Sequence, residues 1–561
     1  MMKLRSYSWL LLCLACLCLS SSLTFAEELP ARTALDDYVN KPDDSYRWEV
    51  YSDQMEDGVR VVVIDMVSQH WRTKEEVNRT EWRHWLTLCI PEKVDSNVGT
   101  LIISGGANGK SARTPRMAIP IAKATNTVIA ELGMVPNQPL IFHNDGVERV
   151  EDEIVAYTWD QFIKTGDTTW PARNPMIKSA VRAMDTMTAF MATKEGGERK
   201  LDEFIVGGAS KRGWTTWLTG ALDDRVVAIV PIVIDVLNTD ASMRHHFEAY
   251  GFYAPSVGDY AQNRIMERMS DPRTKELYEL VDPYYYRHRL DMPKLVLNAA
   301  GDQFFLPDSS QFYWRDLIGE NYLRYIPNTD HSMRDSDAVE TVAAFVHMIS
   351  HDKEIPNIDW TTEEDGTLVV TTDAKPATVK LWQANNPESR DFRLEKLGAK
   401  YESTELQPNG DGKYIGKIKA PEKGWTAYFV EVTYDVGAPM PLKLTTQVNV
   451  LPNIVPFKGK DPNLPTSLTL VCSAPTDGAA QQLAKMAEKM FTDREGIAGR
   501  VTTATRGDQL YINMEPKGDF RQTMQALTVM LKSQKCDDFQ YQVESGPEIT
   551  FPPEQGDQLS E

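Results

Sequence analysis

The stretch Phe204-Ile205-Val206-Gly207-Gly208-Ala209-Ser210-Lys211-Arg212-Gly213 decides the fold class of this 561-residue chain. A short β-branched run is followed at once by a small-residue turn and then by a helix-compatible segment to Leu222. A serine held in such a strand-to-helix turn is a nucleophile elbow, whose usual pattern is Gly-x-Ser-x-Gly. Gly208 fits the first position, Arg212 takes the place of the second glycine, and Gly213 comes one residue late. The sequence predicts a variant elbow with Ser210 as the nucleophile.

Outward from the elbow, short apolar runs alternate with helical stretches between about residues 45 and 350, including helical spacing from Pro175 to Thr193. This order is typical of an α/β fold, in which helices cover both faces of a mostly parallel sheet. The predicted strands are Val59–Met66, Leu86–Ile90, Thr100–Ile103, Thr127–Leu132, Phe204–Val206, Val226–Ile234 and Lys294–Asn298.

The partners that an elbow serine needs follow in the expected chain order, which is serine, acid, histidine. Asp302 comes just after the strand Lys294–Asn298, and His331 lies in a turn-rich loop after a predicted last strand, Tyr322–Ile326. Serine needs a base within hydrogen-bond reach, and the acid fixes the tautomer of that base and stabilises its charged form. The sequence predicts an α/β-hydrolase triad of Ser210, Asp302 and His331.

Two alternative acids remain open, Asp308 and Asp235, the second of which follows the run Val226–Ile234. The plain alternative for His331 is an ordinary loop histidine.

An oxyanion formed during acyl transfer needs preorganised N–H donors. The backbone N–H of Lys211 is one candidate, and the loop Ser104–Asn108 offers Ala107 and Asn108 for the second, by analogy with the glycine loops of esterases. The same loop is similar to a phosphate-binding loop up to Ser111, except that Ser104 replaces the first glycine. No partner strand ending in a magnesium-binding aspartate is evident. The pair His347 and His351 lacks a third ligand, so we expect no metal and no cofactor.

The N-terminus predicts export. Residues 1–26 carry Lys3 and Arg5, an apolar run from Trp9 to Leu19 and a small-residue end at Ala26, which is the pattern of a signal peptide. A membrane anchor is the alternative, but the run is shorter than the roughly 20 residues that a span needs. A lipoprotein site at Cys16 is a further alternative. We expect a secreted or periplasmic protein with no stable membrane span after processing.

Charge and cysteines limit the partners. Removal of Lys3 and Arg5 takes the formal net charge from −20 to −22, which argues against phosphate-mediated binding of nucleic acid. Cys89, Cys472 and Cys536 remain after residue 26, an odd number, and the spacing leaves open whether the last two form a disulfide.

The composition changes after His351. Turns at Asp365-Gly366 and Asn409-Gly410 separate alternating runs that predict antiparallel strands, among them Leu368–Thr372, Thr378–Trp382 and Ala427–Tyr434. A proline-rich bridge then leads to a strand-helix-strand-strand-helix-strand order, with helices predicted at Ala479–Met490 and Phe520–Lys532, which is ferredoxin-like. The predicted domains are a signal peptide (1–26), an α/β-hydrolase domain (27–355), a β-sandwich module (356–455), a ferredoxin-like α+β module (456–548) and a disordered tail (549–561).

Several local motifs, taken together, give the chain a family resemblance over roughly residues 35–455. They are Ser68-Gln69-His70-Trp71, Trp82-Arg83-His84-Trp85, Glu151-Asp152-Glu153-Ile154-Val155-Ala156-Tyr157-Thr158-Trp159, Gly208-Ala209-Ser210-Lys211-Arg212-Gly213 and Pro327-Asn328-Thr329-Asp330-His331-Ser332. In these motifs the chain resembles the PhoPQ-activated pathogenicity-related family, which includes the autocrine proliferation repressor proteins. The resemblance implies an exported α/β-hydrolase with Ser210, Asp302 and His331 as its triad, acting on an ester or a peptide.

One segment favours a peptide substrate. Glu151 and Glu153 open a predicted helix that reaches Trp159, and carboxylates near an active site can hold a free N-terminal amine. The alternative is that acidic residues simply favour the first turn of a helix. Two functions are therefore carried forward: a serine hydrolase of a small ester or peptide, and a catalytically silent secreted binding or signalling protein on the same scaffold.

Overall fold

The computed structural model describes residues 32–459 apart from 114 and 116, and then 468–492, 498–506, 509–516, 531, 539–543 and 548–551. The predicted signal peptide, residues 1–26, lies outside the described residues. Within the described ranges, no helix is both long enough and apolar enough to cross a membrane.

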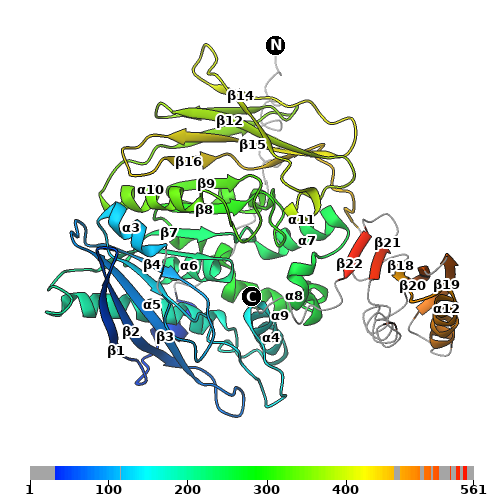
Figure 1. Ribbon diagram of the computed structural model, residues 1–561, viewed down its shortest axis with the longest axis horizontal. Helices are drawn as coiled ribbons and strands as arrows, with labels where there is room; N and C mark the ends of the chain where they lie inside the picture. The colour runs from blue at the N-terminus through cyan, green and yellow to red at the C-terminus, as the bar shows by residue number, and fades with distance from the viewer. Residues whose placement is uncertain are drawn as a thin grey trace, which may run out of the picture.

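A nine-stranded mixed sheet forms the centre of the fold (Figure 1). The strand order is β1-β2-β3-β5-β4-β6-β7-β8-β9; β1, β2, β3 and β5 pair antiparallel, and the pairs from β5 to β9 are parallel. All eight predicted strands, the seven apolar runs and the last strand Tyr322–Ile326, are present, so the α/β prediction is confirmed. The bounds are β1 Arg47–Glu56, β2 Val59–His70, β3 Glu81–Pro91, β4 Val98–Ile103, β5 Ile129–Leu132, β6 Glu203–Ala209, β7 Val226–Ile232, β8 Lys294–Ala299 and β9 Asn321–Ile326.

The edge strand β1 was not predicted. It pairs only with β2, and most of its side chains face solvent, so the sequence shows no alternation of buried and polar positions. Tyr51 and Met55 are exposed by 67% and 66%, respectively.

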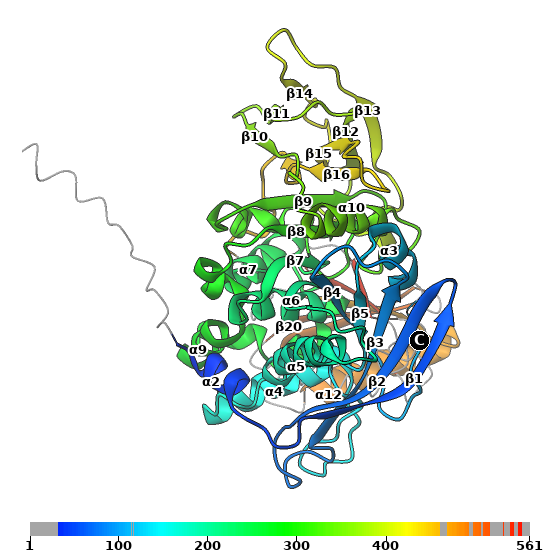
Figure 2. The ribbon, with the colours of Figure 1, turned by 90° about the vertical axis from the view of Figure 1, so that its left-hand side faces the viewer.

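Helices cover both faces of the sheet (Figure 2). On one face α5 (Arg173–Ala192) packs against α6 (Lys211–Leu222) and, near the N-terminus, against α2 (Ala34–Asn40). On the other face α3 (Ala118–Thr125) packs against α10 (Ala338–Ser350). The helix predicted from Pro175 to Thr193 corresponds to α5.

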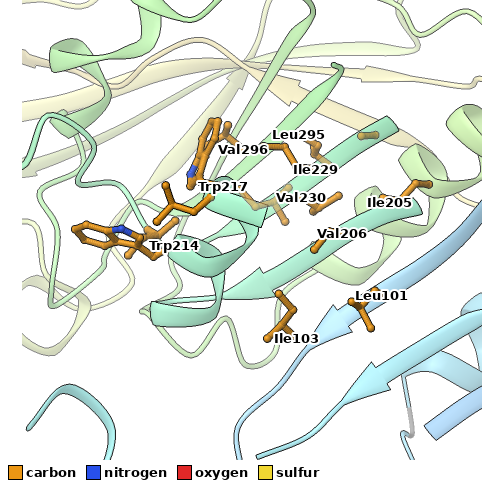
Figure 3. Close-up of a cluster of buried hydrophobic side chains, with 14 of the residues drawn as sticks. Leu101, Ile103, Ile205, Val206, Trp214, Trp217, Ile229, Val230, Leu295 and Val296 are labelled. Atoms are coloured by element: carbon orange, nitrogen blue, oxygen red, sulfur yellow. The ribbon is translucent and has the colours of Figure 1, made fainter. Parts of the chain in front are cut away.

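The core fixes the turn at Ser210 from both sides. Figure 3 shows Trp214 and Trp217 of α6 together with Val206, Ile229 and Val296 of the strands. Trp217, Val206, Ile229 and Val296 are all fully buried. Burial of one such aliphatic side chain contributes about 1.5–3 kcal/mol, so β6 and α6 form a rigid base on either side of the turn.

A helical segment between β7 and β8 was not predicted. It contains α7 (Thr239–Tyr250), α8 (Gly258–Gln262) and α9 (Pro272–Val281), linked by short 3₁₀ turns. Both α8 and α9 pack against α4 (Glu151–Thr165). The segment therefore joins α4 in covering the end of the sheet where β6 stops.

Beyond α10 the chain forms two antiparallel sheets that lie over the β9 side of the central sheet (Figures 1 and 2). The Thr445 hydroxyl accepts a hydrogen bond from the Tyr325 N–H of β9 (2.8 Å). The strands predicted at Leu368–Thr372, Thr378–Trp382 and Ala427–Tyr434 appear as β11, β12 and β15. The first sheet holds β10 Ile358–Thr362, β11 Leu368–Thr372 and β14 Tyr414–Gly416; the second holds β13 Glu402–Glu405, β12 Thr378–Asn386, β15 Trp425–Tyr434, β16 Leu442–Thr445 and β17 Asn449–Leu451.

The C-terminal strands form a separate antiparallel sheet in the order β19-β20-β18-β21-β22. The predicted helix Phe520–Lys532 falls almost wholly on residues outside the described ranges. Cys536 also lies outside them, so the question of a disulfide with Cys472 stays as the sequence leaves it. The elements are β18 Leu468–Ser473, α12 Asp477–Thr492, β19 Ala498–Arg506, β20 Gln509–Pro516, β21 Phe539–Val543 and β22 Glu548–Phe551.

Candidate active site

Ser210 occupies a sharp turn between β6 and α6. Its backbone has φ 57° and ψ −127°, a conformation that side-chain-bearing residues rarely adopt. Its N–H donates to the Ile232 carbonyl oxygen of β7 (2.8 Å), and its own carbonyl accepts from the Trp214 N–H (3.0 Å). These bonds hold the strained turn, and the Ser210 side chain lines a cavity at the end of the sheet.

Two glycines permit this turn, and they explain the departure from the usual motif. A Cβ on Gly208 would lie 2.8 Å from the Arg212 carbonyl oxygen. A Cβ on Gly213 would lie 2.9 Å from the Gly208 oxygen and 3.0 Å from the Ile232 oxygen. The close approach of backbones thus falls on Gly213, so Arg212 at the preceding position can carry a side chain.

We expect the substitution Gly213→Ala to lower the free energy of unfolding by about 1–3 kcal/mol, the usual cost of overpacking. The added methyl group meets backbone oxygens of β6 and β7, which cannot move aside cheaply. Urea unfolding measures the effect. Gly410→Ala is the matched control, because a Cβ at Gly410 meets nothing within 4 Å. Equal midpoints for the two variants would contradict this packing account.

His331 and Asp302 form a hydrogen-bonded pair. The Nδ1 of His331 lies 2.8 Å from Oδ2 of Asp302, and the two side chains are exposed by 12% and 4%. The other carboxylate oxygen accepts the N–H groups of Phe304 (2.7 Å) and Phe305 (3.4 Å). The Nε2 of His331 is buried and has no hydrogen-bond partner within the part of the chain that the structure describes. That nitrogen is therefore left for a hydroxyl group or a substrate.

The three predicted triad positions stand at one edge of the sheet. Ser210 follows β6, Asp302 follows β8 and His331 follows β9, and because β6 to β9 run parallel, their carboxyl ends meet at the same edge. Phe304 and Phe305 lie between the His331–Asp302 pair and Ser210. Both rings contact the His331 ring, at centroid distances of 4.3 and 6.0 Å, and both line the cavity that Ser210 lines.

The alternative acids have other partners. Asp308 accepts hydrogen bonds from Arg390 (2.6 Å) and bonds to His245 (3.0 Å), all three being buried. Asp235 accepts the hydroxyl groups of Tyr313 (2.6 Å) and Tyr325 (2.5 Å). Within the part of the chain that the structure describes, Asp302 is the one of these three aspartates that hydrogen-bonds to His331.

Asp235 gives a pH-dependent prediction. Burial raises its pKa to about 8, against the two tyrosine hydrogen bonds, which lower it. An aspartate in the unfolded chain has a pKa of about 3.9. The stability that the protonated Asp235 carboxyl contributes is therefore complete below that pH, and it is lost as the pH rises through about 8. Asp235→Asn removes this loss. We expect the free energy of unfolding of the variant, relative to that of the parent, to rise by up to about 1.4 kcal/mol per pH unit between the unfolded and the folded pKa.

Urea unfolding of the two proteins at pH 5 and at pH 9 measures that gain. Asp359→Asn, at an exposed position on β10, is the control and should show no such trend. Parallel stability profiles for parent and Asp235→Asn would show that Asp235 is ionised in the folded protein.

The three candidate N–H donors for an oxyanion, those of Lys211, Ala107 and Asn108, differ in their surroundings. The N–H of Lys211 opens α6, where the first helical N–H groups lack intrahelical partners. The loop that carries Ala107 lies beside the elbow, because β4 pairs with β6 up to Ile103 and Gly208. The Asn108 N–H, however, donates to the Gln138 carbonyl oxygen (2.6 Å). This bond commits the Asn108 N–H to the loop that follows β5, so we remove Asn108 from the candidates and retain Lys211 and Ala107.

No group of three or more His, Cys, Asp or Glu side chains among the described residues is arranged to hold a metal ion. His351 bonds through Nδ1 to the His347 carbonyl oxygen (2.9 Å), and Nε2 of His347 lies 3.0 Å from the Lys353 ammonium.

A buried charge cluster supports the start of α6. The Lys211 ammonium lies 2.8 Å from Glu151 and 2.9 Å from Asp152, and Arg212 binds both oxygens of Glu151 at 2.7 Å. Burial alone would raise the pKa of Glu151, but these cations lower it far below its ordinary value. Glu153 instead faces Arg149, at 3.8 Å. The carboxylate of Glu151 is thus already neutralised, and the predicted amine site has no vacant carboxylate there.

The cavity beside Ser210 has a volume of about 40 Å³, room for a few water molecules or a short chain. Trp159 lines it, as do residues that sequence reasoning missed, among them Arg173, Met243 and Tyr260. Several belong to the helical segment between β7 and β8. The one available signal was length: the connection from Ile234 to Lys294 is far longer than the usual loop of about 2–6 residues.

The β-module, which comprises the two antiparallel sheets beyond α10 and their loops (residues 356–455), holds the loops that carry Asp302 and His331. Asn328, in the histidine loop, exchanges two hydrogen bonds with the backbone of Tyr401 (2.8 and 2.9 Å). The Leu394 N–H donates to the Gly301 carbonyl oxygen (2.9 Å), next to Asp302. Gly301 leaves no room for a side chain, since a Cβ there would lie 2.8 Å from the Thr329 oxygen. These contacts fix the acid loop and the histidine loop to each other.

Comparison with known sequences gives two extensive matches. The family model described as PhoPQ-activated pathogenicity-related protein matches residues 35–393. The autocrine proliferation repressor protein A of Dictyostelium discoideum is 35% identical over 459 residues, which are 76% of this chain and 92% of that protein. The range 35–393 contains the elbow, Asp302 and His331.

Solved structures give more distant matches. Acetyl xylan esterase 1 from a Thermoanaerobacterium species is 14% identical, with a TM-score of 0.39, covering 57% of this chain and 95% of the esterase. Acylaminoacyl peptidase from Pyrococcus horikoshii is 11% identical, with a TM-score of 0.33, covering 54% of this chain and 50% of the peptidase.

Proposed function

The chain belongs to the PhoPQ-activated pathogenicity-related protein family, and from this starting point we propose that it is an exported serine hydrolase that cleaves a carboxylic ester or a peptide bond. The observation that carries the proposal is the placement of a strained elbow serine and of the hydrogen-bonded His331–Asp302 pair at the same edge of the sheet. Strained nucleophile turns and carboxylate-oriented histidines are arrangements that acyl transfer requires.

In the proposed mechanism, the Oγ of Ser210 attacks the substrate carbonyl carbon while Nε2 of His331 accepts the hydroxyl proton. The tetrahedral intermediate collapses, the bond to the leaving group breaks, and His331 returns the proton to that group. A water molecule then attacks the acyl carbon while His331 accepts its proton; the bond to the Ser210 Oγ breaks, His331 returns the proton to Oγ, and the carboxylic acid is released. Asp302 holds the Nδ1–H of His331 throughout, so that Nε2 is the nitrogen available to accept a proton.

The oxyanion is proposed to lie at the start of α6, against the Lys211 N–H and the loop of Ala107. The loss of one such donor typically costs roughly 10²–10³ in turnover. The charge cluster of Lys211, Arg212 and Glu151 fixes this first turn of the helix, and the buried Arg173 guanidinium binds the Lys211 carbonyl oxygen (2.8 Å). The donor is therefore preorganised rather than mobile.

A two-arm turnover assay tests the proposal. The purified protein is given 4-nitrophenyl esters of short acids in one arm and 4-nitroanilides of N-terminally free peptides in the other. We expect nitrophenolate or nitroaniline release with a first-turnover burst, and an acyl adduct on Ser210 after acid quenching. If neither arm is turned over and no adduct forms on folded protein, the hydrolase proposal fails, and the silent binding or signalling protein takes its place.

A further inference from the structure

Arg173 is the first residue of α5 and is only 1% exposed. Its NH1 donates to the Lys211 carbonyl oxygen (2.8 Å), its guanidinium lies over the Trp214 ring at 4.5 Å from the centroid, and the Tyr260 hydroxyl lies beside it. Burial lowers its pKa, yet an arginine stays protonated in proteins. A full positive charge is thus buried next to the elbow.

Arg173 makes no direct ion pair with a carboxylate within the described ranges of the chain; its link to an acid runs through the Tyr260 hydroxyl, which donates to Asp152 (3.0 Å). The nearby acids are already used, because Lys211 pairs with both Glu151 and Asp152, and Arg212 binds Glu151 through two hydrogen bonds. Lys211 and Arg212 therefore take the direct ion pairs of both carboxylates, and Asp152 reaches Arg173 only without direct contact. Its Nε is buried and has no hydrogen-bond partner in the described part of the molecule.

The unpaired group lines the cavity of Ser210. The ion-paired side chains of Lys211 and Asp152 also line it, and the other walls are mainly apolar and aromatic, including Trp214, Met243 and Phe304. Trp159, also a wall residue, has a second buried N–H without a partner among the described residues. A buried, unpaired cation is costly to the fold, and uncompensated charges of this kind concentrate at binding and catalytic sites.

We propose that Arg173 binds a carboxylate carried by the substrate, so that the cavity beside Ser210 selects esters or peptides whose buried group ends in a carboxylate. The proposal rests on the hydrolase function above and adds a substrate class to it. A guanidinium fork suits a carboxylate, and the fork here is held rigid by the Lys211 oxygen and the Trp214 ring. The small volume of the cavity favours a short chain between the carbonyl and the acid.

The first test compares three aryl esters of matched length: 4-nitrophenyl hydrogen succinate, 4-nitrophenyl methyl succinate and 4-nitrophenyl valerate. The methyl ester keeps an acceptor oxygen but has no charge, and the valerate has neither. We expect kcat/KM for the free acid to exceed that of both neutral esters at least tenfold. In a second arm the carboxylate lies on the leaving group, and butyryl glycolate is compared with its methyl ester. In each arm the ratio of kcat/KM for the free acid to kcat/KM for the neutral ester is measured. The arm with the larger ratio identifies the side of the substrate that enters the cavity.

Arg173→Met should remove this preference, whereas Arg173→Lys, which keeps the charge without the fork, should retain part of it. Arg182→Met is the matched control, since Arg182 lies on the same helix but pairs with Asp185 away from the cavity. Because Arg173→Met can fail to fold, binding is also measured on the parent protein alone. Free glutarate should raise its unfolding temperature, and glutaramide at the same concentration should not.

The outcomes separate the two proposals. If the neutral esters are hydrolysed as well as the free acid in both arms and glutarate has no effect, the carboxylate site is overturned while the hydrolase stands. If no ester is hydrolysed but glutarate stabilises the parent, stabilises Arg173→Lys less and does not stabilise Arg173→Met, the carboxylate site stands while the hydrolase fails.

Discussion

Ser210→Ala is expected to lower turnover of any accepted ester by about 10⁴-fold or more, because removal of the nucleophile leaves only binding and oxyanion stabilisation. The fold should survive, since the Ser210 contacts that hold the turn are made by its backbone N–H and carbonyl groups. KM should change little, because the serine hydroxyl is used in the chemical step rather than in binding. Initial rates and thermal unfolding of both proteins measure these effects.

Ser403→Ala is the matched control, since Ser403 lies on the exposed strand β13. It should leave both rate and stability unchanged. A folded Ser210→Ala protein with parental turnover would remove Ser210 from the mechanism altogether.

Asp302→Asn is expected to reduce kcat by roughly 10³–10⁴-fold with little change in shape. The amide can donate a hydrogen bond to Nδ1 of His331, which moves the imidazole proton to Nε2, the nitrogen that must accept the Ser210 proton. The N–H bonds from Phe304 and Phe305 can still be accepted by the amide oxygen, so the loop should keep its position. Steady-state kinetics and circular dichroism together separate lost chemistry from lost structure.

Asp308→Asn separates the two acids. Asp308 joins His245 to Arg390 of the β-module, so its loss should lower stability and leave the proton path of His331 intact. A rate loss from Asp308→Asn equal to that from Asp302→Asn would mean that the acid was assigned to the wrong aspartate.

The positions of the serine, the acid and the histidine along the chain could be predicted from sequence because they depend on the strand order alone. Ser210, Asp302 and His331 each follow a strand with a clear apolar run, and parallel strands end at the same edge. The sequence showed that Gly213 comes one residue later than the usual Gly-x-Ser-x-Gly pattern, but it did not show why. That reason lies in tertiary structure, because two backbone oxygens from different strands leave no room for a Cβ at Gly213.

The rest depends on tertiary contacts. β1 has no buried face, so no periodicity marks it. Asn108 has the right position in its loop, but its N–H is directed to the Gln138 oxygen, a contact 30 positions along the chain. Glu151 shows its pairing with Lys211 and Arg212 only when α4 and α6 come together. Arg173 could not be identified as a cavity residue, because a lone arginine at the start of a helix is typical of any exposed surface.

The most direct test of the central claim is covalent labelling of the purified protein with a fluorophosphonate, read by intact mass and by peptide mapping. An activated serine reacts with this probe because a neighbouring base accepts its proton. The account predicts near-stoichiometric labelling at Ser210 in the parent, none in Ser210→Ala, and strongly slowed labelling in Asp302→Asn. A folded parent that stays unlabelled, or that carries the label on another serine, would contradict it.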